Sequence, residues 1–290
     1  MSKIPSILIT GATGNTGTEL AKQLSLRGVP FRAMVRSLEK ATALASLEGA
    51  EIVTGDFSDP ASITNALIGI EHTFLLTNSS EQAEKLQGDF IDIARGAGLR
   101  HIVKLSQLAA DIHSPVRFLR YHAAVEQKIK ESGIAYTFLR PNLFMQGLLG
   151  FRDPIVQQGK FFASIGDAKI SLVDIRDIAA VAVEALIDKK HEGKIYDLTG
   201  PEALTHEEIA AHLSRMLGRE IKFINVSPAD MRQAVIAAGF PEWQADGLIE
   251  DYAHYSRGEA AAISRAVKHV TGRAPRNFET FARDYVAAFS

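Results

Sequence analysis

The 290-residue sequence contains no cysteine, a single tryptophan and no long run of apolar residues. Without cysteine the chain has no disulfide, no thiolate nucleophile and no cysteine-ligated metal site. Its apolar runs are shorter than the roughly 20 residues that a membrane-spanning helix needs, and no basic segment leads into a signal-like apolar core. A formal net charge of −2 gives no reason to expect nucleic acid or an anionic membrane as a partner. These absences predict a soluble, cytoplasmic protein.

The first 140 residues alternate between short β-rich runs and helical stretches. The runs are SILIT (6–10), FRAMV (31–35), AEIVT (50–54), EHTFLLT (71–77), HIVKL (101–105) and YTFLR (136–140). Apolar strands that are separated by crossover helices are typical of a parallel sheet with both faces covered, and each crossover should be right-handed. The sequence therefore predicts an α/β fold with a doubly wound parallel sheet of the Rossmann type.

The alternation loosens after Pro141. Residues 169–188 predict a short strand followed by a helix, with Asp174 or Asp177 near the helix start, where we expect Asp177 to have a structural role. KIYDLTG (194–200) predicts a further strand. We expect residues 1–150 to form the dinucleotide-binding domain, with 169–200 returning to it, and 151–290 to form most of a smaller α/β substrate lobe.

The segment 204–219, LTHEEIAAHLSRMLGR, carries both of its helix-boundary signals. Thr205 and Glu208 have the spacing of a capping box, and Gly218 marks the helix end. The IKFINV run that follows is strand-like, and the rest of the chain is mostly helical. HEEIAAH (206–212) superficially matches a zinc motif, but its histidines are six residues apart and do not share a helix face, so we expect no metal site.

The strongest functional motif is GATGNTG (11–17), at the first strand-to-helix junction. The first glycine permits a tight turn, the second a close approach of the backbone to a pyrophosphate, and the third close packing of the helix on the sheet. The helix N-terminus then faces the phosphates. We expect dinucleotide binding by Gly11, Thr13, Gly14, Asn15, Thr16 and Gly17.

The end of the second strand distinguishes between the two nicotinamide cofactors. An acidic residue there would bind the ribose 2′-hydroxyl of NAD(H). The sequence instead has Arg36, and its first carboxylate after the strand is Glu39. Because a guanidinium group suits a phosphate dianion, NADP(H) is favoured over NAD(H).

TGATGNTG, MVRS, GDFSD (55–59), LRP (139–141) and VDIRDIAA (173–180) follow one another along the chain. With these motifs the sequence resembles the NmrA-like group of atypical short-chain dehydrogenases/reductases over nearly its whole length. The resemblance implies that Asp56 and Phe57 lie at the adenine and that Leu76 and Thr77 line the nicotinamide ribose. It also implies that Pro141, Asn142 and Phe144 approach the nicotinamide.

The sequence departs from typical short-chain dehydrogenases in their catalytic pair. Those enzymes use a tyrosine with a lysine four residues later, and none of the six tyrosines here has a lysine at that spacing. When this sequence is aligned with the corresponding helix of the family, Phe118 occupies the tyrosine position, His122 the lysine position and Glu126 the acidic position. Ser106 matches the serine position. The resemblance therefore leaves His122 and Ser106 as the candidate catalytic residues.

The missing tyrosine restricts the chemistry. Reduction of an isolated ketone produces an alkoxide that needs an acid in place, whereas a quinone or a conjugated dye delocalises or removes the incoming charge. We therefore expect an NADP(H)-dependent oxidoreductase that transfers hydride to a quinone or another conjugated small molecule, acting as a monomer or homodimer. By the resemblance, Phe144, Met145, Trp243 and Tyr255 are expected to line the site of a flat aromatic substrate.

Two other functions remain open. Family members also include proteins that bind NADP(H) without turnover, so a non-catalytic redox sensor of the NmrA type is the main alternative. An isomerase or epimerase with tightly held NAD is disfavoured by the missing tyrosine and by Arg36. The sequence lacks the Gly-x-Ser-x-Gly elbow of serine hydrolases and the Lys-Ser/Thr ending of a P-loop.

Overall fold

The computed structural model describes residues 5–290, which form two compact units. Unit 1 contains the described residues up to His113, together with Leu119–Arg140 and Ile178–Tyr196. Unit 2 contains Ser114–Phe118, Pro141–Asp177 and Asp197–Ser290. The chain therefore passes between the units several times.

A seven-stranded sheet, in the order β3-β2-β1-β4-β5-β6-β8, organises unit 1. Its strands are β1 (Ile7–Ile9), β2 (Phe31–Val35), β3 (Ala50–Thr54), β4 (His72–Leu75), β5 (His101–Leu105), β6 (Ala135–Pro141) and β8 (Lys194–Leu198). The pairs from β3 through β6 are parallel. Every residue of β1, β2 and β5 is buried, as expected for strands with both faces covered. The doubly wound α/β fold predicted from the sequence is confirmed.

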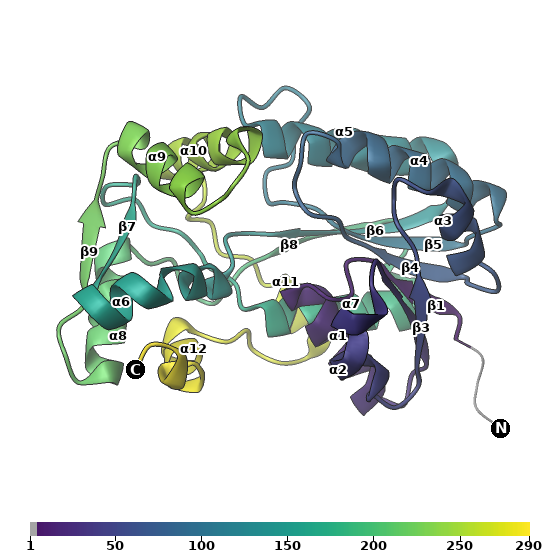
Figure 1. The fold of residues 1–290 in the computed structure, drawn as a ribbon, viewed down its shortest axis with the longest axis horizontal. Coiled ribbons are helices and arrows are strands. Elements are labelled where there is room, and N and C mark those ends of the chain that lie inside the picture. The colour runs from purple at the N-terminus through teal and green to yellow at the C-terminus, as the bar shows by residue number, and fades with distance from the viewer. Residues whose placement is uncertain (1–4) are drawn as a thin grey trace. The chain divides into compact units, whose positions relative to one another are not determined.

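Helices cover both faces of this sheet (Figure 1). One face carries α3 (Pro60–Ala66), α4 (Ala83–Gly96) and α5 (Arg117–Ser132), and the other carries α1 (Asn15–Leu26), α2 (Thr42–Ala45) and α7 (Ile175–Ile187). The short helix η1 (Leu38–Ala41) precedes α2, and η3 (Lys189–His191) follows α7. Phe90 of α4 and Phe138 of β6 belong to the apolar core between the sheet and α3, α4 and α5. The strand order reverses between β1 and β4, which is where open α/β sheets bind ligands.

Unit 2 contains a separate two-stranded parallel sheet of β7 (Lys160–Ala163) and β9 (Lys222–Asn225). Its helices are η2 (Met145–Phe151), α6 (Arg152–Gln158), α8 (His206–Leu217), α9 (Pro228–Ala237), α10 (Glu242–Ser256), α11 (Ala266–Thr271), α12 (Phe278–Asp284) and η4 (Val286–Ala288). The core includes the fully buried rings of Phe161, Phe278, Phe281 and Phe289. The unit thus has an apolar interior of its own.

Local signals set the boundaries of α8. The Thr205 hydroxyl accepts a hydrogen bond from the Glu208 amide and the Glu208 carboxylate accepts one from the Thr205 amide, which together form the predicted capping box. Gly218 ends the helix in the left-handed conformation, with φ of 65°. The prediction of a short strand at the start of 169–188 is wrong. Ile170 and Val173 form only isolated bridges there, because their partner segments do not extend the pairing.

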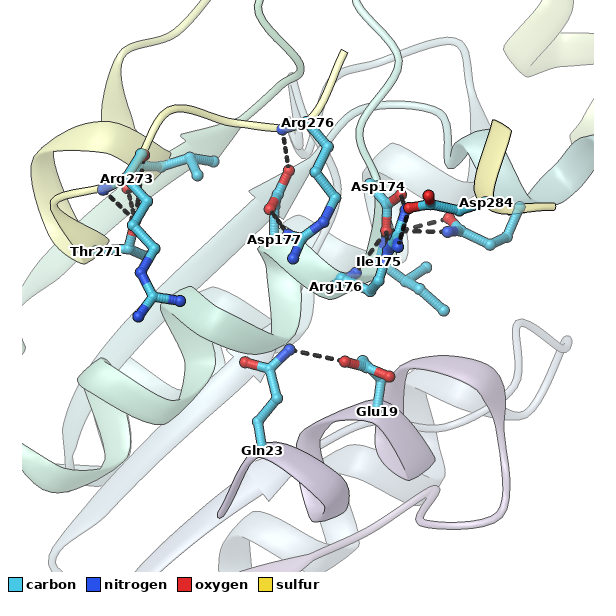
Figure 2. Close-up of polar contacts among 12 residues, drawn as sticks. Glu19, Gln23, Asp174, Ile175, Arg176, Asp177, Thr271, Arg273, Arg276 and Asp284 are labelled. Carbon is cyan, nitrogen blue, oxygen red and sulfur yellow. Dashed lines mark hydrogen bonds and ion pairs between the residues drawn. The ribbon is translucent and has the colours of Figure 1, made fainter. Parts of the chain in front are cut away.

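Ion pairs join distant segments within unit 2 (Figure 2). The fully buried Asp174 accepts hydrogen bonds from the Arg176 guanidinium and from the Arg176 amide, and Arg176 also pairs with Asp284 of α12 at 2.6 Å. Asp177 accepts from the amide and the guanidinium of Arg276. Burial raises the pKa of Asp177, against the opposing effect of Arg276. Asp174, through Arg176, and Asp177, through Arg276, therefore connect the start of α7 to the C-terminal segment.

Candidate functional site

The glycine segment forms a tight turn against the end of β4. Gly11 has φ of 59°, which favours glycine, and a Cβ there would lie 2.9 Å from the Leu76 side chain. The Thr10 hydroxyl accepts a hydrogen bond from the Leu76 amide and lies 3.0 Å from the Leu76 carbonyl oxygen. A Cβ on Gly17 would lie 2.3 Å from the Gly11 carbonyl oxygen. The turn is therefore tight at Gly11, as predicted, and at Gly17 the start of the helix packs closely against the Gly11 carbonyl group.

Helix α1 begins without a side-chain cap. Its N-cap is Gly14, no side chain accepts a hydrogen bond there, and the first turn contains no acidic residue. Thr13, Gly14 and Asn15 are exposed, whereas Thr16 and Gly17 are buried. Free amides and the positive end of a 12-residue helix form a binding place for an anion. The turn and the open helix start fit the pyrophosphate of a dinucleotide.

Arg36 is exposed immediately after β2. Among the described residues it makes neither an ion pair nor a hydrogen bond, so its guanidinium is available to a ligand. It lies near enough to Asp56 to help lower the pKa of that carboxyl group, although hydrogen bonds from the Ser58 hydroxyl and amide are the larger causes. A free guanidinium group at the carboxyl end of β2 fits a 2′-phosphate.

The other residues expected around the adenosine and the ribose have local partners. Asp56 accepts hydrogen bonds from the amide and the hydroxyl of Ser58, at 2.8 and 2.6 Å. The half-buried Phe57 ring packs on Phe90, with the ring centroids 5.4 Å apart. The Thr77 hydroxyl accepts a hydrogen bond from Gln87. These contacts order the loops that follow β3 and β4, and the cofactor contacts of Asp56, Phe57, Leu76 and Thr77 remain predictions.

Ser106 follows β5 and belongs to a chain of hydrogen bonds in unit 1. Its hydroxyl donates to Glu126 at 2.6 Å, and Glu126, only 2% exposed, pairs with Arg140 through two hydrogen bonds of 2.9 and 2.5 Å. The hydroxyl hydrogen of Ser106 is thus committed to a carboxylate. In this state Ser106 can accept a hydrogen bond from a ligand but does not donate one.

His122 on α5 contacts a fully buried lysine. Lys104 of β5 lies with its Nζ 3.0 Å from His122 Nδ1 and 3.0 Å from the Leu105 carbonyl oxygen. Burial lowers the pKa of Lys104 to about 7, although Glu126 opposes the shift. Burial, Lys104 and Arg140 hold the pKa of His122 well below its usual range. When Lys104 is charged it can only donate, so His122 Nδ1 accepts and the ring proton lies on Nε2.

Sequence reasoning missed Lys104 and Arg140, which complete this polar cluster. Lys104 lies in HIVKL, a strand that is otherwise apolar apart from His101 at its start. A charged residue in the middle of a strand with both faces covered is unusual enough to serve as a signal. Arg140 gave no comparable signal, because it lies near the end of β6, where a polar residue is not unusual.

The residues expected near the nicotinamide and the substrate belong to unit 2. Pro141 and Asn142 are buried, and the Asn142 side-chain amide donates to Ser171 and to the Ala260 carbonyl oxygen. Phe144 lines a cavity, whereas Met145 and Tyr255 lie in the apolar core. Trp243 packs on Phe118, with the ring centroids 5.4 Å apart. Of the four substrate candidates only Phe144 is among the residues that line this cavity, and the roles of all four remain predictions.

The fold and the glycine turn are typical of dinucleotide-binding α/β proteins, and comparisons with known proteins identify the family of this chain. A model of the NmrA-like family matches residues 4–282. The chain is 37% identical to the NAD(P)H azoreductase of Xenophilus azovorans, over 98% of this chain and 99% of that one. The chain belongs to the NmrA-like family, as the motifs indicated.

Two solved structures resemble the fold closely. The NADPH complex of an NADPH-dependent quinone oxidoreductase from Escherichia coli has a TM-score of 0.87 at 31% identity, covering 97% of this chain and 99% of that one. The NADP(H) complex of triphenylmethane reductase from Citrobacter sp. has a TM-score of 0.83 at 29% identity, covering 95% and 98%. Among residues 5–290, no helix combines the length and the apolar composition required to cross a membrane.

Proposed function

We propose that this protein is an NADP(H)-dependent reductase that transfers hydride to a quinone or another conjugated small molecule. The glycine turn and the N-terminus of α1 would hold the pyrophosphate, and Arg36 would hold the 2′-phosphate. When bound, the reduced nicotinamide supplies the hydride. The relatives support this assignment, since they include an NAD(P)H azoreductase and an NADPH-dependent quinone oxidoreductase whose structure was solved with NADPH.

The choice of acceptor rests on the hydrogen bonds of the polar cluster formed by Ser106, Glu126, Arg140, Lys104 and His122. Ser106 donates to Glu126, and among residues 5–290 Lys104 bonds to His122 and to the Leu105 carbonyl oxygen, not to a tyrosine hydroxyl. The Tyr121 ring packs on His122, with the ring centroids 4.2 Å apart, but its hydroxyl is hydrogen-bonded to Ser79. The imidazole of His122 is neutral and is therefore a weak acid. It can orient an acceptor oxygen or nitrogen through Nε2–H, but it is poorly suited to protonate a localised alkoxide. A quinone or a conjugated dye spreads the incoming charge over its π-system and needs orientation more than an acid.

The experiment is a steady-state assay of NADPH oxidation with matched acceptors. Menadione, an azo dye and a triphenylmethane dye should each accelerate the loss of absorbance at 340 nm, whereas cyclohexanone should not. Reduction of cyclohexanone at a comparable rate would contradict the proposed role of the cluster. A protein that binds NADPH but oxidises it with none of these acceptors would instead be a non-catalytic sensor.

A further inference from the structure

Unit 2 contains an open cavity of about 600 Å³ whose role no motif predicted. It is lined by residues of η2, β7, α8, α9, α10 and adjacent loops. Figure 1 labels β7, α8, α9 and α10 in the same part of the ribbon. Six aromatic side chains line it: Phe144, Phe151, Phe161, Phe162, Phe240 and Tyr252. Most other lining residues are aliphatic or glycine. The volume and this composition suit a flat, apolar molecule of two or three fused rings.

Two side chains in the lining are buried and carry a polar group, His206 and Tyr252. His206, at the start of α8, is 4% exposed, and its ring packs near Phe161, Phe223 and Tyr252, with centroid separations of 5.9, 5.0 and 6.3 Å. Its Nδ1 is buried and has no hydrogen-bond partner among the described residues. Burial lowers the pKa of His206 to about 4, so the ring is neutral near pH 7. A neutral imidazole offers one N–H donor and one acceptor nitrogen, and an unpaired buried polar group is costly.

The charge of the lining also selects among ligands. Asp230, exposed on α9, is the one charged residue among those that line the cavity, and no lysine or arginine is among them. An anionic group would therefore enter an apolar space without a cationic partner and near a carboxylate. An uncharged or cationic aromatic molecule meets neither obstacle.

We propose that this cavity binds a flat aromatic molecule that is uncharged or cationic, and that His206 forms a hydrogen bond with a carbonyl, hydroxyl or nitrogen atom at its edge. That this ligand is the hydride acceptor rests on the proposed function. Its binding does not, because every lining residue belongs to unit 2, whereas the glycine turn and Arg36 belong to unit 1.

The first experiment compares two probes of nearly equal shape, anthraquinone-2-sulfonamide and anthraquinone-2-sulfonate. Calorimetric titration of the NADPH-free protein should show at least tenfold tighter binding of the uncharged sulfonamide. Because the chain has no cysteine, quinone probes cannot form thiol adducts with it. Equal or tighter binding of the sulfonate, or binding of neither probe, would overturn the proposal.

Variants then locate the binding site. His206→Phe keeps a ring but removes the hydrogen bond and should weaken sulfonamide binding about fivefold. Gly147→Trp adds a side chain in η2 at a position where a Cβ would meet no atom within 4 Å, and should reduce binding more strongly. His212→Phe, on the same helix as His206 but outside the lining, should leave binding unchanged. Unaltered affinity in both cavity variants would refute the location.

The two proposals fail in distinguishable ways. If the sulfonamide binds in the cavity and NADPH oxidation is absent with every acceptor, the reductase assignment is wrong and the cavity assignment stands. If NADPH-dependent reduction is normal in Gly147→Trp while sulfonamide binding is lost, the cavity holds a ligand other than the acceptor. Unfolding midpoints and NADPH affinity, measured for each variant, identify any that is misfolded.

Discussion

The buried Lys104 allows a quantitative test through the pH dependence of stability. Replacement by methionine retains a long side chain and removes the titratable amine. Burial lowers the pKa of the folded-state amine from 10.5 to about 7. Below pH 7 both the folded and the unfolded protein hold the proton, so the folded protein bears the full cost of a buried charge. Between pH 7 and 10.5 the unfolded chain binds more protons, and the free energy of unfolding therefore rises with pH.

The size of the effect follows from that pKa. Each pH unit above 7 adds about 1.4 kcal/mol to the stability of the unmodified protein, or roughly 3 kcal/mol by pH 9.5. Lys104→Met lacks this contribution. We expect the variant to be more stable at pH 6 by a few kcal/mol, and we expect its advantage to shrink by roughly 3 kcal/mol at pH 9.5.

The assay is urea denaturation of both proteins at several values between pH 6 and 9.5. Lys128→Met serves as the control, because Lys128 forms a partly exposed pair with Asp92 on the surface. Its stability difference from the unmodified protein should vary little over this range. A Lys104→Met difference that stays constant within 1 kcal/mol from pH 6 to 9.5 would refute the lowered pKa of Lys104 and its place beside His122.

Three further changes test the cofactor turn and the polar cluster. Arg36→Ala should lower the ratio of NADPH to NADH affinity about tenfold or more, measured by calorimetry; an unchanged ratio would rule out its phosphate contact. Gly17→Ala should weaken NADPH binding and cost about 1–3 kcal/mol in unfolding experiments, because its Cβ would lie 2.3 Å from the Gly11 carbonyl oxygen; Gly88→Ala, where the Cβ meets no atom within 4 Å, should not destabilise the protein. His122→Phe should lower kcat with menadione about tenfold while leaving NADPH affinity within twofold, and full turnover in this variant would exclude His122 from the reaction.

The features that could be predicted from the sequence are those that local patterns determine. Apolar runs of five to seven residues between helices indicated the strands of unit 1, and Thr205 with Glu208 marked the start of α8 correctly. GATGNTG indicated the turn because glycine is required where φ is positive and where backbone segments touch. Each of these signals lies within a few residues of the feature that it specifies.

The features that could not be predicted depend on partners that are distant in the chain. Strand β7 pairs with β9, about 60 residues later, and KFFA alone contains no sign of that pairing. Arg140 pairs with Glu126 across two elements, and His206 acquires its surroundings from β7, β9 and α10. The motif HEEIAAH suggested a comparison with metal sites, whereas the physical importance of His206 lies in the rings around it.

The most direct test of the central claim is a single-turnover experiment with deuterated cofactor. Protein loaded with NADPH, or with NADPH deuterated at the transferring C4 position, is mixed with menadione in a stopped-flow spectrometer. We predict a first-order loss of absorbance at 340 nm that is at least twofold slower with the deuterated cofactor, and no loss when cyclohexanone replaces menadione. Persistent absorbance with menadione, from a protein shown to bind NADPH, would contradict the account.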